Sequence, residues 1–138
     1  MPSNKKPLRR DTQGAAAAHD LAILLARSCA ENRCRDVLVL DLRGLSPVTD
    51  FFILATGTSP RQMGAVAHLV IEAGDTVGER PWGVEGKESG RWVLLDFVDV
   101  VVHVFSEEAR KYYDIELLWG DAPHINWQAG WTPRAPLD

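Results

Sequence analysis

The stretch that most constrains the fold predicts a strand, a tight turn and a helix in direct succession. Phe51–Thr56 is a run of apolar, aromatic and β-branched residues, which is typical of a buried strand. A helix start follows at once: Ser59 suits the N-cap, Pro60 suits the first helical position, and Gln62 completes a Ser-x-x-Gln capping box. This order of elements indicates an α/β fold.

The helix that follows carries one apolar stripe, at the spacing i, i+3, i+4, i+7 and i+8, which faces a sheet: Met63, Val66, Ala67, Val70 and Ile71. Gly74 is expected at the C′ position that ends this helix.

The loop 57–59 between that strand and helix, at a sheet edge, has two interpretations. A glycine-containing loop at a helix N-terminus is a place where many α/β proteins bind anions, so it could cradle a phosphate. The other interpretation is an ordinary capped turn. The sequence Gly57-Thr58-Ser59 lacks the further glycines and the lysine of a phosphate-binding loop, which favours the capped turn.

Periodicity and turn residues predict the remaining elements. They are a helix over 15–32, a strand over 36–42, a short strand over 82–85, a hairpin formed by 91–97 and 100–105, a helix over 106–113 with Ser106 as N-cap, and a short apolar segment, 115–119, that packs down.

The hairpin has a definite expected register. If Val98 and Asp99 form a two-residue turn, Phe97 pairs with Val100 and Trp92 pairs with Phe105. One face is then uniformly apolar and belongs to the core. The other face mixes aromatic, aliphatic and acidic groups, so it is either incompletely covered or meant for a partner: Trp92, Leu94, Asp96, Val101, His103 and Phe105.

Three regions are expected along the 138 residues: a disordered basic arm (1–14), one domain (15–120) and an extended tail rich in Trp and Pro (121–138). The central region has 10 basic and 16 acidic residues, a balance that suits a basic protein partner better than nucleic acid, so little direct RNA contact is expected.

Several classes of protein and site are not expected. No run of apolar residues is long enough to span a membrane, and no apolar segment directly follows the basic N-terminal residues as in a signal peptide. Cys29 and Cys34 match neither a redox pair nor a zinc motif, so we expect reduced thiols in a cytoplasmic protein. The carboxylates and the four histidines are scattered, which predicts no catalytic, metal or cofactor site.

Three segments resemble the Iojap-related ribosomal silencing factor family, formerly DUF143: TDFFILATGTSPRQ, GVEGKESGRWVLLDF and DVVVHVFSEEARKYYDIELLW. The resemblance runs from about residue 15 to 119. It implies a mixed sheet of about five strands flanked by helices, related to nucleotidyltransferases but without their catalytic carboxylates. It also implies a non-enzymatic protein, homodimeric when free, that binds the large ribosomal subunit through ribosomal protein L-fourteen. There it blocks joining of the small subunit and represses translation under nutrient limitation.

On the family pattern, the partner contact maps to the hairpin and the preceding loop. Trp92 is the expected aromatic anchor and Leu94 extends the apolar patch, although Trp92 could instead be a core residue beside Phe105. The acidic residues on this side either face basic side chains or are a solvated surface. The complete expected set is Glu85, Trp92, Leu94, Asp96, Asp99 and His103.

The chain departs from the family pattern at Val98, where a glycine is usual. A β-branched residue tolerates positive φ poorly, so a looser turn is expected. The tail past Gly120 could contact the ribosome, cap a dimer or do neither. The alternative function is a nucleotidyltransferase-like enzyme that binds nucleotide phosphates at the loop 57–59 and a metal at Asp96.

Overall fold

A computed structural model describes residues 12–133. Its elements in chain order are α1 (Thr12–Glu31), β1 (Arg35–Asp41), β2 (Phe51–Thr56), α2 (Pro60–Asp75), β3 (Gly83–Glu85), β4 (Trp92–Asp96), β5 (Val100–Phe105), α3 (Glu107–Tyr113) and α4 (Ile115–Leu118). None of the helices within this range is long and apolar enough to cross a membrane.

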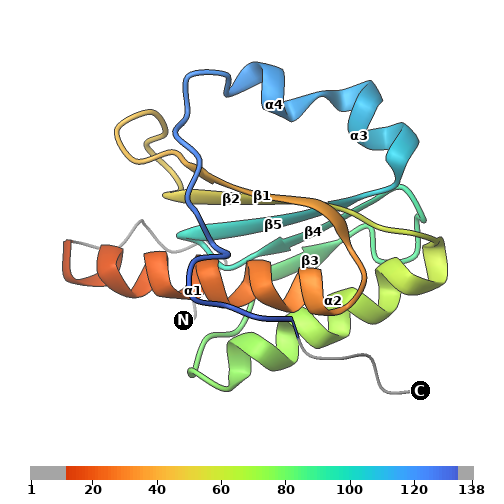
Figure 1. Cartoon of the computed structure of the whole chain (residues 1–138), viewed down its shortest axis with the longest axis horizontal. Helices are drawn as coiled ribbons and strands as arrows, with labels where there is room; N and C mark the ends of the chain where they lie inside the picture. The colour runs from red at the N-terminus through yellow and green to blue at the C-terminus, as the bar shows by residue number, and fades with distance from the viewer. Residues whose placement is uncertain (1–11, 134–138) are drawn as a thin grey trace, which may run out of the picture.

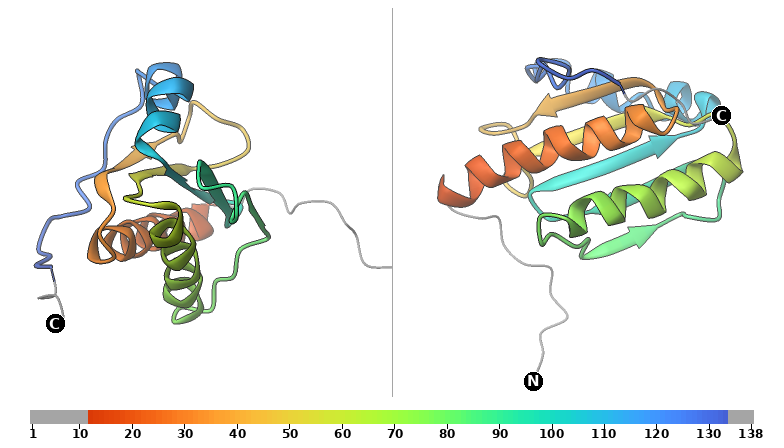
Figure 2. Two further views of the ribbon diagram at one scale, coloured as in Figure 1. Left: turned by 90° about the vertical axis from the view of Figure 1, so that its right-hand side faces the viewer. Right: turned by 60° about the horizontal axis from the view of Figure 1, so that its bottom comes forward.

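The five strands form one mixed sheet, as the family resemblance implied, and their order is β1-β2-β5-β4-β3. Only β2 and β5 run parallel; the other neighbours are antiparallel. The helices α1 and α2 cover one face of the sheet, and α3 and α4 lie on the other (Figure 1). Figure 2 shows α1 and α2 side by side beneath the strands. Because both faces are covered, two apolar clusters form, a large one under α1 and α2 and a smaller one under α3 and α4.

The predicted strand–turn–helix unit is confirmed. Ser59 Oγ accepts a hydrogen bond from the Gln62 amide at 3.1 Å, and the side-chain Oε1 of Gln62 accepts from the amide of Thr58 at 2.9 Å. The apolar stripe of α2 faces the core, with Met63, Val66, Ala67 and Val70 buried. In a capping box the Gln62 side chain would accept from the amide of the N-cap residue, Ser59; here it accepts from the amide of Thr58, one residue earlier.

The prediction for Gly74 was wrong. This glycine lies inside α2, which continues to Asp75 and has Thr76 as its C-cap. A Cβ at residue 74 would lie 2.7 Å from the carbonyl oxygen of Glu79 and 2.9 Å from the ring of Phe97. Glycine is therefore required by the close approach of the next turn and the hairpin end, and not by the end of the helix.

The hairpin register is confirmed, since Trp92 pairs with Phe105 and Asp96 with Val101. The turn, however, stays tight. Val98 has φ +75°, the amide of Asp99 donates to the Phe97 carbonyl at 3.0 Å, and the Phe97 amide donates to the Val100 carbonyl at 2.8 Å. The Asp96 carboxylate also accepts from the Val98 amide at 2.8 Å. These bonds hold the valine in a left-handed conformation, so the looser turn expected from the sequence does not form.

The chain ends differ from the sequence-based division. The helix α1 begins at Thr12, three residues earlier than predicted, and residues 1–11 of the predicted arm lie outside the described residues. After α4 the chain runs along β1 as an extended segment (Figure 1). There Ile125 donates to the Val39 carbonyl, and the buried indole of Trp127 donates to the Val37 carbonyl at 2.9 Å. This part of the tail packs into the main core.

Candidate functional site

A shallow groove of about 230 Å³ lies between β3 and β4, lined by Glu85, Gly86, Trp92 and Leu94. Pairing of β3 with β4 places Glu85 directly opposite Leu94. Trp92, Leu94 and Asp96 alternate along β4 with the buried residues Val93 and Leu95, so all three point away from the main core. The groove therefore brings together three of the six residues expected to contact a partner, namely Glu85, Trp92 and Leu94.

Gly86 also lines the groove and was not predicted as a site residue from the sequence. It has φ +74°, and a Cβ there would overlap the Trp92 carbonyl oxygen, only 2.0 Å away. Any other residue would push the chain away from Trp92. The available signal was the pair of glycines, 86 and 90, that brackets a polar turn directly before the tryptophan.

Trp92 is half-buried, so it can be both a core residue beside Phe105 and an accessible aromatic residue of the groove. Its ring packs against Phe105 with centroids 4.9 Å apart and against Tyr113 of α3 at 4.7 Å. Its Nε1 donates a hydrogen bond to Nδ1 of His103 at 3.1 Å. The indole is thus held on three sides while part of it lines the groove, a state suited to a rigid aromatic anchor.

His103 lies beneath this tryptophan and is only 3% exposed. The rings of Phe52 and Phe105 pack against it. Burial lowers the pKa of His103 to about 4, and Asp96 opposes the shift, so the ring is neutral near pH 7. Because Nδ1 accepts from Trp92, the proton resides on Nε2, which has no hydrogen-bond partner among residues 12–133. The histidine therefore holds Trp92 from below, and its expected contact with a partner stays a prediction.

The two aspartates of the hairpin end have different positions. Asp96 is half-buried on the same face as Trp92 and binds the Val98 amide. Asp99 is 2% exposed, and its carbonyl oxygen accepts bonds from the amides of Asp50 and Phe51. Asp99 is therefore part of the fold's interior, and its expected contact with a partner stays a prediction. It joins the hairpin turn to the start of β2.

The strand register places the two parts of the alternative nucleotide site, the loop 57–59 and Asp96, at opposite ends of the sheet. The loop 57–59 follows Thr56, which is opposite Phe105 and hence at the Trp92 end of the sheet. Asp96 is four residues away along β4, about 13 Å at the usual rise per strand residue. The amide of Thr58 is already bound by Gln62. The phosphate-binding and metal-binding halves of the alternative site are therefore not brought together.

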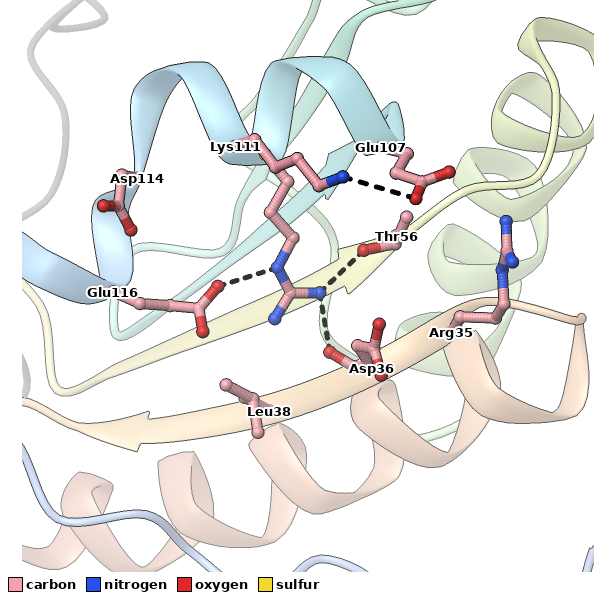
Figure 3. A pocket seen from close by; sticks show the side chains of 9 residues that line it. Arg35, Asp36, Leu38, Thr56, Glu107, Lys111, Asp114 and Glu116 are labelled. Carbon is pink, nitrogen blue, oxygen red and sulfur yellow. Dashed lines mark hydrogen bonds and ion pairs between the residues drawn. The ribbon is translucent and has the colours of Figure 1, made fainter.

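A larger cavity of about 460 Å³ lies between α3–α4 and the strands β1 and β2 (Figure 3). Its lining mixes basic and acidic side chains, and Arg110 spans it. The guanidinium donates to Glu116 at 2.8 Å, to Thr56 Oγ1 at 2.8 Å and to the Asp36 carbonyl at 2.6 Å. Arg110 therefore fastens α3 and α4 to the sheet. Within residues 12–133 no group of three or more His, Cys, Asp or Glu residues could hold a metal ion.

The segment 115–119 packs down only in part. Ile115 and Trp119 contact the smaller apolar cluster, as predicted, but Leu117 and Leu118 are each 78% exposed. Tyr112 of α3 is nearly as exposed. The exposure of these three residues was not predicted from the sequence, because periodicity in so short a helix does not indicate which side is covered.

A family model and individual relatives of known sequence both match this chain, and they point to the same family. The family model described as "Ribosomal silencing factor during starvation" matches residues 15–136, which includes the tail beyond Gly120. The chain is 43% identical over 100 residues to the ribosomal silencing factor RsfS of Bacillus subtilis, covering 72% of this chain and 85% of that protein.

Two further relatives extend the comparison. A mouse protein named "Mitochondrial assembly of ribosomal large subunit protein 1" is 30% identical over 117 residues, which cover 83% of this chain and 50% of the mouse protein. A crystal structure from Chromobacterium violaceum has a TM-score of 0.72 at 36% identity, covering 88% of this chain and 93% of the other.

Proposed function

Because the chain belongs to the ribosomal silencing factor family, we propose that it binds the large ribosomal subunit through ribosomal protein L-fourteen. Bound there, it blocks joining of the small subunit and represses translation when nutrients are limiting. It acts by occupying space and so needs neither a reaction nor a cofactor. The name of the mouse relative, which refers to the ribosomal large subunit, supports a partner on that subunit.

The observation that carries the proposal is the groove between β3 and β4, with its half-buried tryptophan and acidic neighbours. Trp92 and Leu94 supply the apolar contact, and Glu85 and Asp96 place carboxylates on the same side. A rigid aromatic anchor beside acidic groups suits a basic protein surface. The chain as a whole carries 19 acidic and 15 basic residues, which favours such a partner over bare RNA.

Sedimentation of purified ribosomal subunits through sucrose gradients tests the proposal. We expect the wild-type protein to migrate with the large subunit and to reduce the joined particle. Trp92→Ala should weaken binding by about 2 kcal/mol or more, roughly 30-fold, because it removes the anchor. Glu85→Lys should weaken binding most at low salt, because it reverses an exposed charge without touching the core.

Leu69→Ala is the matched control, since Leu69 is an exposed apolar residue of α2 on the opposite face of the sheet. Unfolding curves of all variants separate loss of binding from loss of fold. Wild-type protein that stays at the top of the gradient and leaves subunit joining unchanged would contradict the proposed function. Wild-type binding that survives both Trp92→Ala and Glu85→Lys would contradict the groove as the contact surface.

We also propose that the free protein is a homodimer, which light scattering coupled to size-exclusion chromatography measures directly. Leu117 and Leu118 are the first positions to substitute, because exposed apolar side chains are common in interfaces between subunits. A monomeric mass for the wild-type protein at micromolar concentration would contradict the dimer.

A further inference from the structure

The turn that joins α1 to β1 brings the two cysteines of the chain together. The Cys34 amide donates to the Cys29 carbonyl at 3.1 Å, the Arg33 amide donates to the Ala30 carbonyl at 3.3 Å, and Arg33 has φ +73°. This is the Schellman pattern of helix ends, in which the first and last residues of the six-residue turn face each other and usually form an apolar contact. Here those two residues are Cys29 and Cys34. Their separation of five residues matches no metal or redox motif, but it is the separation of the two end residues of this turn.

The two thiols are free and differ in their burial. Cys29 is completely buried, whereas Cys34 is 9% exposed. The hydrogen bond between the thiols raises the pKa of Cys29, and burial raises it further; the same bond lowers the pKa of Cys34. Gln62 Nε2 lies 3.7 Å from the Cys34 sulfur and also donates to the Asn32 carbonyl at 2.7 Å. Cys34 is therefore the more reactive sulfur of the pair.

We propose that Cys29 and Cys34 are a modification site that reacts with low-molecular-weight disulfides and closes a reversible disulfide bond across the α1–β1 turn. The proposal rests on the geometry of this turn and is independent of ribosome binding. The backbone hydrogen bond from the Cys34 amide to the Cys29 carbonyl closes the turn and supplies the proximity that a disulfide requires.

The reaction has two exchange steps. Cys34 loses its thiol proton to solvent, and the thiolate attacks one sulfur of the small disulfide, forming a mixed disulfide and releasing one small thiolate. Cys29 then loses its proton and attacks the Cys34 sulfur, forming the intramolecular bond and releasing the second small thiolate. Each released thiolate takes up a proton. Overall the two protein thiols are oxidised by two electrons, and the small disulfide is reduced to two thiols.

The test uses full-length reduced protein and glutathione buffers that range from fully reduced to fully oxidised. After the remaining thiols are alkylated, trypsin cuts at Arg33, between the two cysteines, into peptides 28–33 and 34–35. We expect these two peptides to stay joined until a reductant is added. The intact protein should lose two hydrogen atoms in mass.

Two comparisons make the result specific to the turn. The folded protein should form the bond at a glutathione disulfide fraction about tenfold lower than the same chain in urea, because folding supplies the proximity. Cys29→Ser should accumulate the glutathione adduct on Cys34, whereas Cys34→Ser should form no adduct on the buried Cys29.

The wild-type result decides the matter even if a serine variant folds poorly. The proposal is overturned if both wild-type thiols remain open to alkylation under fully oxidising conditions, or if the reaction stops at the Cys34 adduct. It is equally overturned if the bond forms only between two chains, or as readily in urea as in the folded protein.

Discussion

At the scale of single residues, the pair formed by Trp92 and His103 determines how the groove is presented. The indole has one polar atom, and His103 Nδ1 accepts its hydrogen bond at 3.1 Å. The histidine can accept only while its ring is neutral, and its burial among Phe52 and Phe105 keeps it so. The orientation of Trp92 in the groove therefore depends on a buried histidine.

This burial predicts a pH dependence of folding. The pKa of His103 is about 4 in the folded protein and near 6.5 when unfolded, so between these values the unfolded chain binds more protons. The free energy of unfolding should be fully retained above pH 6.5 and should fall as the pH drops towards 4. The loss attributable to His103 is about 3 kcal/mol at most.

Denaturant unfolding at a series of pH values measures this loss. His103→Asn is the comparison, because its amide oxygen can still accept from Trp92 but does not titrate. The variant should show a shallower fall between pH 6.5 and 4. Equal slopes for the two proteins in that window would show that His103 is not the titrating group.

At the scale of elements, the turn between β4 and β5 keeps its register at a conformational cost. Val98 occupies a left-handed conformation with φ +75°, which is costly for a β-branched residue. The turn is retained because its amides and the Asp96 carboxylate are hydrogen-bonded around the valine, and because Asp99 is tied to Asp50 and Phe51. The long-range pairing of the sheet outweighs the local preference of the residue.

Val98→Gly should therefore stabilise the protein, since glycine adopts positive φ without a steric penalty. We expect the free energy of unfolding to rise by about 1 kcal/mol after the greater backbone entropy of glycine in the unfolded chain is subtracted. Chemical denaturation gives the value. Val77→Gly, at an exposed valine without positive φ, is the matched control and should lower stability. A loss of stability in both variants would refute the strain at Val98.

At the scale of the whole molecule, the segment after α4 completes the main core. Trp127 is 8% exposed, its indole donates to the Val37 carbonyl, and Arg27 of α1 donates to the carbonyl oxygens of Trp127 and Ala129. The segment also pairs with β1 at the edge of the sheet, where Leu40 and His124 form a bridge. It therefore covers a strand edge that would otherwise be open.

Trp127→Ala should lower the free energy of unfolding by about 3–5 kcal/mol, as expected for removal of a buried tryptophan. Trp131→Ala is the control, because Trp131 is only half-buried: its ring packs against Trp127 from the outside of the core, and its indole donates to the exposed Glu31. Trp131→Ala should lower the free energy of unfolding by much less than Trp127→Ala. Thermal or chemical unfolding of both variants provides the comparison, and equal losses would contradict a core role specific to Trp127.

The sequence by itself determined those features that depend on neighbours along the chain or on strict alternation. The cap at Ser59, the stripe of α2 and the register from Trp92 to Val101 all follow from spacings of two to four residues, and they form as predicted. A two-residue period also separated the core face of β4 from the face that carries the groove.

Only the tertiary structure decided which residues become buried and which stay accessible. Elements distant in sequence bury His103, Asp99 and Trp127. No such element within residues 12–133 covers Leu117 and Leu118, which stay exposed. Gly74 likewise depends on the tertiary structure, since it is required by a neighbouring turn and the ring of Phe97. Burial is a property of the whole packed chain, and no local period determines it.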